Sequence, residues 1–213
     1  MEGAVAKPWD DSIKASKSLT IFAGPSIPGS VWAGVFTNAI AEFNRLSSAN
    51  TLGVTFTAST TAPDPNNSGG ANVQFEVANG KIGFVSFGTP FSLQVIGTSL
   101  FGDTKQVSVK YGDSGPERMI RAFIVLPATP QINASPVRGV GDGVKLLMAV
   151  HEMVHACGLT NADHCPDDLF NGSPQPRAGS TPADDKIEVN GPKLLPPLFL
   201  APKTIAAIQN NWK

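Results

Sequence analysis

The stretch VHEMVHACGLTNADHC, residues 150–165, contains all three histidines of the 213-residue chain. Histidines placed at random would cluster this closely roughly one time in a hundred, so the grouping favours a chemical role. On a helix, His151 and His155 lie four residues apart on the same face, where both imidazoles can bind one zinc ion. Glu152 is turned about a quarter of the circumference away and would stand beside such a metal. That is the place of a general base that takes a proton from zinc-bound water.

The residues around the motif predict that it lies on a buried helix. Apolar side chains recur at helical spacing before and within the motif, at Leu146, Leu147, Val150, Val154 and Cys157. Asp142 can cap the start of this helix, and Gly158 stands where a residue in the left-handed conformation would end it. The alternative is a core helix that carries two incidental histidines, with His164 at the surface.

A third ligand is expected beyond Gly158, because a catalytic zinc ion generally has three protein ligands and an open position for water. His164 is the natural candidate, since it is the remaining histidine and lies just past the turn. Asp163 and Asn161 are weaker candidates, because carboxylate oxygen binds zinc and amide oxygen rarely does. We therefore expect a ligand set of three histidines.

The segment HEMVHACGL, residues 151–159, resembles the HExxHxxGxxH helix and turn of the metzincin zinc peptidases, particularly the matrixin-like ones. The resemblance implies a hydrolase that is a zinc metalloendopeptidase. In such an enzyme, His151 and His155 would be metal ligands and Glu152 the general base.

The chain departs from the family pattern at two places. The third histidine of the family follows the glycine by three residues, where this chain has Asn161, so His164 requires a loop that is three residues longer. The family also has a methionine turn beneath the metal, whereas the last methionine here, Met153, lies inside the predicted helix. Leu169 in the segment PDDLF occupies a similar place, and we expect it to form a hydrophobic floor of the site without sulfur.

Two cysteines, Cys157 and Cys165, bracket the predicted metal turn. A disulfide between them would close a small loop, stabilise the fold by roughly 2 to 3 kcal/mol and clamp the third ligand. The alternative is two unpaired thiols, with Cys157 filling the core. Cys165 could also bind zinc itself in place of His164, whereas Cys157 faces the opposite side of the helix from the ligands.

Composition and charge exclude several classes of function. Charged residues make up 15% of the chain, with 21 glycines and 18 prolines, which predicts a weakly charged surface rich in turns. A net charge of −1 offers no attraction to nucleic acid or to an anionic membrane, and no apolar run is long enough to span a bilayer. The first residues, MEGAVAKPWDD, are not a signal peptide. We expect a monomer that is secreted or particle-associated, with its leader removed or with an export route that needs none.

Local patterns predict the order of the elements. Alternating or continuous apolar runs predict strands at residues 18–24, 52–60, 72–78 and 118–128, the last typical of a central strand covered on both faces. Ser30 is expected to cap a helix whose apolar residues recur at intervals of three and four as far as Leu46. GFVSFG, SLQVIG and QVSVKYG, between Gly80 and Gly112, could each form a strand. One of these three should be the edge strand above the active-site cleft. The loop PDPNNSGG, residues 63–70, contains little apolar material to order it.

These elements predict a single α+β domain of 213 residues. Their order is similar to that of the metzincin upper lobe, which implies a twisted mixed sheet with two main helices. The predicted parts are an N-terminal extended arm at 1–17, an upper lobe at 18–158 that includes the zinc helix, and a lower lobe at 159–213. The lower lobe should be irregular over 166–193 and end in a helix at 201–212.

The predicted function is a zinc-dependent metalloendopeptidase that acts on protein or peptide substrates, with Glu152 as the general base. Tyr111, the sole tyrosine, is interpreted as a strand residue rather than a catalytic one. The alternative is a proteolytically inactive zinc-binding structural or assembly protein that retains the peptidase fold. Glu152 argues against this alternative, because a structural site gains nothing from a base, whereas a fourth ligand such as Cys165 would favour it.

Overall fold

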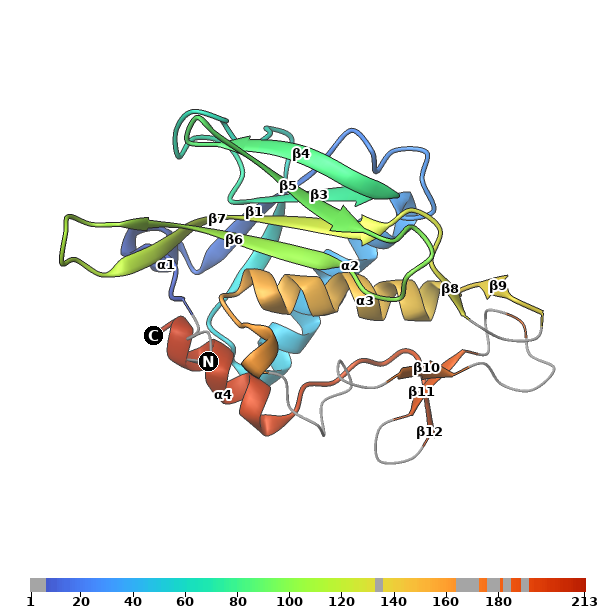
Figure 1. Cartoon of the computed structure of the whole chain (residues 1–213). Helices are drawn as coiled ribbons and strands as arrows, with labels where there is room; N and C mark the ends of the chain where they lie inside the picture. The colour runs from blue at the N-terminus through green and yellow to red at the C-terminus, as the bar shows by residue number, and fades with distance from the viewer. Residues whose placement is uncertain (1–6, 133–135, 164–172, 176–180, 182–184, 189–191) are drawn as a thin grey trace.

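Strand β7 (Glu117–Pro127) lies inside a five-stranded sheet with the strand order β2-β1-β3-β7-β6 (Figure 1). The computed structural model describes residues 7–132, 136–163, 173–175, 181, 185–188 and 192–213. The other strands of this sheet are β1 (Ser18–Ala23), β2 (Thr55–Ser59), β3 (Val73–Ala78) and β6 (Asp103–Lys110). Strands β1, β2, β3 and β7 run parallel to one another, and β6 is antiparallel to β7. The predicted α+β class with a mixed sheet is confirmed.

The three short stretches between Gly80 and Gly112 all form strands. The first two pair with each other as an antiparallel hairpin, β4 (Gly80–Ser86) and β5 (Thr89–Val95), outside the five-stranded sheet. The third becomes β6, which is one of the two edge strands of the sheet; β2 is the other. The edge strand that the sequence left open is therefore the stretch QVSVKYG and the residues just before it.

Two layers cover the sheet, as Figure 1 shows. The long helices α2 (Ala33–Asn50) and α3 (Asp142–Ala156) lie on one face, and the β4–β5 hairpin lies on the other. On the hairpin side, the ring of Phe84 packs against that of Phe123 in β7, with centroids 4.8 Å apart. Because β7 is buried on both faces, its second half, residues 122–127, is continuously apolar rather than alternating.

The N-terminal arm is anchored by Trp9, whose side chain is completely buried. Its backbone forms an isolated parallel bridge with Met119 in β7. The prediction of an extended arm is wrong for α1 (Asp11–Ser16). The Asp10 carboxylate caps this short helix by accepting a hydrogen bond from the amide of Ser12 at 2.9 Å. One capped turn and a half is too short to show a helical period in the sequence.

The C-terminal part contains more regular structure than the sequence indicated. The helix α4 (Pro202–Asn211) is present as predicted. The region expected to be irregular includes a three-stranded antiparallel sheet of β10 (Ser173–Gln175), β11 (Lys186–Glu188) and β12 (Pro192–Leu194). A two-stranded pair, β8 (Gln131–Ile132) and β9 (Arg138–Gly139), precedes α3. Strands of two or three residues are too short for an alternating pattern, so backbone pairing alone defines them. None of the helices described is long and apolar enough to cross a membrane.

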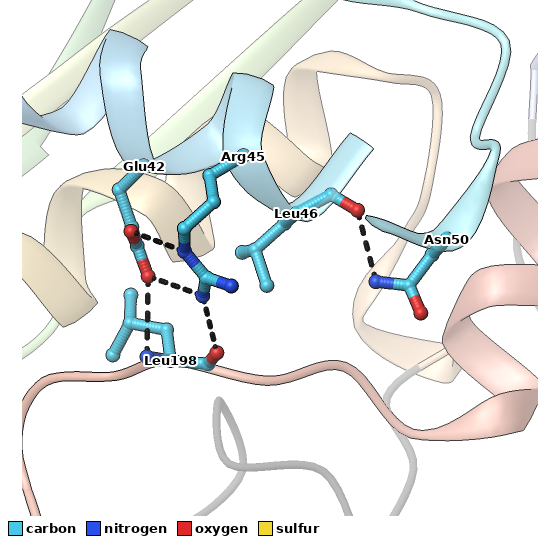
Figure 2. Close-up of polar contacts among 5 residues, drawn as sticks. All are labelled: Glu42, Arg45, Leu46, Asn50 and Leu198. Carbon is cyan, nitrogen blue, oxygen red and sulfur yellow. Dashed lines mark hydrogen bonds and ion pairs between the residues drawn. The ribbon is translucent and has the colours of Figure 1, made fainter. Parts of the chain in front are cut away.

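Polar contacts fasten the chain before α4 to helix α2 (Figure 2). Arg45 donates to the Glu42 carboxylate through two guanidinium nitrogens, at 2.8 and 2.7 Å, and to the carbonyl of Leu198 at 2.7 Å. The amide of Leu198 in turn donates to Glu42 at 3.2 Å. One turn further along α2, the Asn50 side chain donates to the Leu46 carbonyl at 2.9 Å. The pair Glu42 and Arg45 thus satisfies both backbone groups of a residue far away in the sequence.

The polar loop 63–70 is ordered by a buried cation. The guanidinium of Arg121, on β7, donates to the carbonyls of Asp64, Asn67 and Gly69. Within the loop, the Asp64 carboxylate accepts the amide of Asn66 and the side-chain amide of Asn67, both at 2.8 Å. The loop therefore uses hydrogen bonds to Arg121 in place of the apolar contacts that its sequence lacks.

Candidate functional site

Helix α3 places the HExxH motif beneath β6 and is fixed at its start by a distant carboxylate. The apolar residues that predicted the helix are buried or half-buried, and most of them belong to the main core. The prediction that Asp142 is the cap is wrong, because the helix begins at Asp142 and the cap position is Gly141. The amide of Gly141 donates to the buried Asp185 carboxylate at 3.1 Å, and Arg138 forms an ion pair with the same carboxylate. Asp185, next to β11, therefore fixes the start of α3.

The end of α3 agrees with the prediction for Gly158. This residue has a φ of +103°, and its amide donates to the His155 carbonyl at 2.9 Å. A Cβ at this position would lie 2.5 Å from the carbonyl oxygen of Lys7, so only glycine fits. Two indoles satisfy the next carbonyls: Trp9 donates to Ala156 at 2.8 Å, and Trp212 donates to Cys157 at 3.2 Å. The end of α3 is thus held by Trp9 and Trp212, which lie near the two ends of the chain.

The two helix histidines face each other, as their spacing predicted. Their Nε2 atoms are 3.0 Å apart, and the ring centroids are 4.7 Å apart. The two rings are thus at hydrogen-bond distance from each other. Two imidazoles that share one tetrahedral zinc ion have their nitrogens about 3.3 Å apart, which is close to this spacing. The Nδ1 atom of His155 lies 3.0 Å from the carbonyl oxygen of Leu159, a contact that requires a proton on Nδ1. That tautomer leaves the lone pair on Nε2, toward His151.

Burial favours the neutral, metal-binding form of His155. Burial lowers the pKa of His155, and the Leu159 carbonyl and the charge of Asp163 oppose this shift only in part. Gln106 of β6 donates to the carbonyls of His155 and Leu159, at 2.8 and 3.0 Å. Gln106 thus fixes the Leu159 carbonyl that in turn holds Nδ1 of the imidazole, an arrangement of the kind that orients zinc ligands.

Glu152 is 5% exposed and lies against β6. Its Oε2 accepts a hydrogen bond from the hydroxyl of Thr104 at 2.6 Å. Burial raises the pKa of Glu152 to about 7, helped by the charge of Asp103 and opposed by hydrogen bonds from Thr104 and the Gly102 amide. A carboxyl group whose pKa lies near neutrality can accept and return a proton at pH 7.

The β6 residues beside the motif were missed by the sequence analysis. Thr104 contacts Glu152, and Gln106 contacts the backbone at His155, so two side chains in alternate positions reach α3. Gly102 continues this series toward the chain start, because a Cβ there would lie 2.9 Å from Glu152. The sequence showed that alternate residues of this strand face the same side, but it did not show which residues of the chain they contact.

The predicted third metal ligand, His164, is not among the residues that the structure describes. His164, Cys165 and Leu169 lie outside the described residues, so the third-ligand, disulfide and hydrophobic-floor predictions stay predictions. Across the described ranges, no group of three or more His, Cys, Asp or Glu side chains is placed to hold a metal ion. Cys157 is buried in the core, and burial raises the pKa of its thiol well above the usual value.

The weaker ligand candidates have other contacts. Asn161 and Asp163 lie in a short 3₁₀ helix, η1 (Asn161–Asp163), directly after the Gly158 turn. The Asp163 carboxylate accepts the amide of Thr160 at 2.7 Å and its hydroxyl at 2.9 Å, in the manner of a capping box. Asn161 is exposed to solvent. Asp163 thus shapes the turn that leads to His164.

Tyr111 belongs to the N-terminal contact rather than to the histidine pair. It follows the last residue of β6, is exposed, and donates its hydroxyl to the carboxylate of Asp10. The prediction that it lies within a strand is wrong by one residue, because β6 ends at Lys110.

The described site therefore consists of two facing imidazoles, the buried carboxyl group of Glu152 on the same helix, and an edge strand that contacts Glu152 and the backbone of His155. The chain matches no known protein-family model, and the search of curated proteins found no match.

Proposed function

We propose that this protein is a zinc-dependent metalloendopeptidase with a metzincin-like fold. The observation that supports it most is the approach of the His151 and His155 Nε2 atoms to 3.0 Å, with a buried Glu152 between the two histidines in sequence. His164 is the proposed third ligand. Zinc, when bound, supplies a Lewis acid that makes water acidic near neutral pH and polarises a peptide carbonyl.

The chain's own residues would orient the ligands and move the proton. The Leu159 carbonyl holds the Nδ1 proton of His155, so that Nε2 is available to the metal. Glu152 would take a proton from the attacking water and pass it to the leaving amine, which requires a pKa close to the working pH.

Strand β6 supports an extended peptide as substrate. It is the edge of the five-stranded sheet, and within the described part of the chain no strand pairs with its outer side. A peptide could add to this edge by backbone hydrogen bonds, which is a common way of binding an extended chain. Thr104 and Gln106 extend from the same strand to the motif on α3, so a peptide on β6 would lie close to Glu152.

The decisive experiment measures zinc stoichiometry together with casein cleavage, with and without a chelator. We expect one zinc per chain, and cleavage that the chelator abolishes and added zinc restores. Glu152→Gln should keep zinc and fold but lose roughly a hundred- to ten-thousand-fold in rate, because the amide preserves the shape and removes the base. Stoichiometric zinc without cleavage of any protein substrate would support the inactive zinc-binding structural or assembly protein instead.

A further inference from the structure

The carboxyl group of Glu152 is enclosed on one side by strand β6. The hydroxyl of Thr104 donates to Oε2 at 2.6 Å, and the same hydroxyl lies 3.4 Å from the backbone carbonyl of Glu152. A distance of 2.6 Å is at the short end of the usual range for an O–H···O hydrogen bond. The contact therefore selects one orientation of a side chain that otherwise has three rotatable bonds.

Gly102 closes the enclosure from the other end. A Cβ at this position would lie 2.9 Å from both Cγ and Oε1 of Glu152, and 2.7 Å from a methyl group of Leu126. A real side chain here would have to displace the carboxyl group or the core. Gly102, directly before β6, and the hydroxyl of Thr104 on β6 thus lie against the two oxygens of Glu152.

We propose that Gly102 and Thr104 form a cradle that positions Glu152 for catalysis, with Thr104 as the positioning residue. This inference rests on the proposed peptidase function. Thr104 lies on β6, the strand to which a peptide substrate would add. The same strand would therefore position both the general base and the scissile bond. Misplacing a catalytic group by about 1 Å can cost on the order of a hundredfold in rate, so a single hydroxyl can matter at this point.

The test uses the full-length, zinc-loaded protein and compares Thr104→Val with Thr104→Ser. Valine keeps the shape and removes the donor, whereas serine keeps the donor. We expect Thr104→Val to lower kcat roughly 10- to 100-fold with a change in KM below about twofold, and Thr104→Ser to restore most of the loss. Gly102→Ala should likewise lower kcat and leave KM nearly unchanged. Thr89→Val and Gly83→Ala are the matched controls, because Thr89 is an exposed strand residue and a Cβ at Gly83 meets no atom within 4 Å.

A second readout does not depend on activity. A double-mutant cycle of Thr104→Val and Glu152→Ala, measured by urea unfolding and with zinc content determined in parallel, reports whether the two side chains interact. We expect Thr104→Val to lower the unfolding midpoint of the parent chain and to have a much smaller effect when Glu152 is already alanine. Zinc content should stay the same in Thr104→Val and Thr104→Ser.

The outcomes separate the two proposals. If the parent protein cleaves casein and Thr104→Val matches it in kcat, the positioning role is refuted and the peptidase function stands. If the parent protein cleaves nothing, the peptidase function fails, and equal midpoint shifts in the two backgrounds would refute the cradle as well. Loss of kcat in both Thr104→Val and Thr104→Ser would also overturn it, because the hydroxyl would then not be the active group.

Discussion

The indole N–H of Trp9 donates to the carbonyl oxygen of Ala156 at 2.8 Å, across 147 residues of sequence. Ala156 is the last residue of α3 and follows the second histidine of the motif directly. The carbonyl groups of the last helical turn lack partners within the helix, so a buried helix end needs donors from elsewhere. Trp9 supplies one of them, and the N-terminal arm thereby becomes part of the support of the proposed metal site.

Trp9→Phe should destabilise the fold and weaken zinc binding, because the smaller phenyl ring fills less of the core and the donor to Ala156 is lost. Leaving a buried carbonyl without its donor costs about 1 to 3 kcal/mol. Urea unfolding and competition with a chromophoric chelator measure the two effects. The matched variant is Trp32→Phe, which removes an indole bond of the same length, 2.8 Å, to Pro127 at the end of β7. Trp32→Phe should lose similar stability and keep its zinc affinity. Equal loss of zinc affinity in both variants would show that Trp9 acts through general stability alone.

Alanine substitutions at Asn161, Asp163 and His164 should identify the third ligand. We expect His164→Ala to lose zinc on dialysis, because imidazole is a much better zinc ligand than an amide and the chain beyond Gly158 is long enough to return. Asp163→Ala should keep zinc and lose some stability, since its carboxylate holds the turn at Thr160. Metal analysis after dialysis measures the outcome. Retention of stoichiometric zinc by His164→Ala, together with its loss in Asp163→Ala, would rule out the three-histidine ligand set.

Stability should fall in acid partly because of Glu42. Burial raises the pKa of this carboxyl group, but the hydrogen bonds from Arg45 and from the Leu198 amide outweigh it, so the pKa lies below its usual value near 4.5. A lowered folded-state pKa contributes stability that is present above the unfolded-state pKa and lost as the pH falls through the folded-state pKa. The loss is therefore expected below about pH 4.5.

Glu42→Gln tests this assignment by urea unfolding at a series of pH values from about pH 3 to about pH 7. The variant should be less stable than the parent at neutral pH, and the difference should shrink toward the acid end. Asp113→Asn is the comparison, because Asp113 is an exposed acid in the β6–β7 turn. A constant difference between Glu42→Gln and the parent across the whole range would contradict the predicted linkage.

Arg121→Leu should loosen the loop at 63–70. The substitution keeps an apolar stem in β7 but leaves three loop carbonyls without the guanidinium that they share. We expect a loss of stability on the order of 1 to 3 kcal/mol and faster amide hydrogen exchange within the loop. Arg118→Leu, on the same strand, is the comparison and should leave exchange in the loop unchanged. Unaltered exchange in Arg121→Leu would mean that the loop is ordered without this cation.

The sequence by itself determined the elements whose signal is local. The apolar repeat of α3, the histidines four residues apart and Gly158 at the helix end all depend on contacts within a few residues, and the structure confirms each of them. The runs that became β1, β2, β3 and β7 were also recognisable, because each strand is long enough to show alternation or continuous burial.

Only the tertiary structure decided which residues support the site. Thr104 meets Glu152 across 48 residues, Asp185 meets Gly141 across 44, and Arg121 meets Asp64 across 57. Each of these contacts joins a polar side chain to a group on another element, and neither side carries a local period that specifies its partner. Choosing β6 as the edge strand likewise required knowing which strand pairs with β7. Strand pairing and long-range hydrogen bonds depend on which distant segments become neighbours in space. Packing of the core determines those neighbours, and a local sequence pattern carries no information about them.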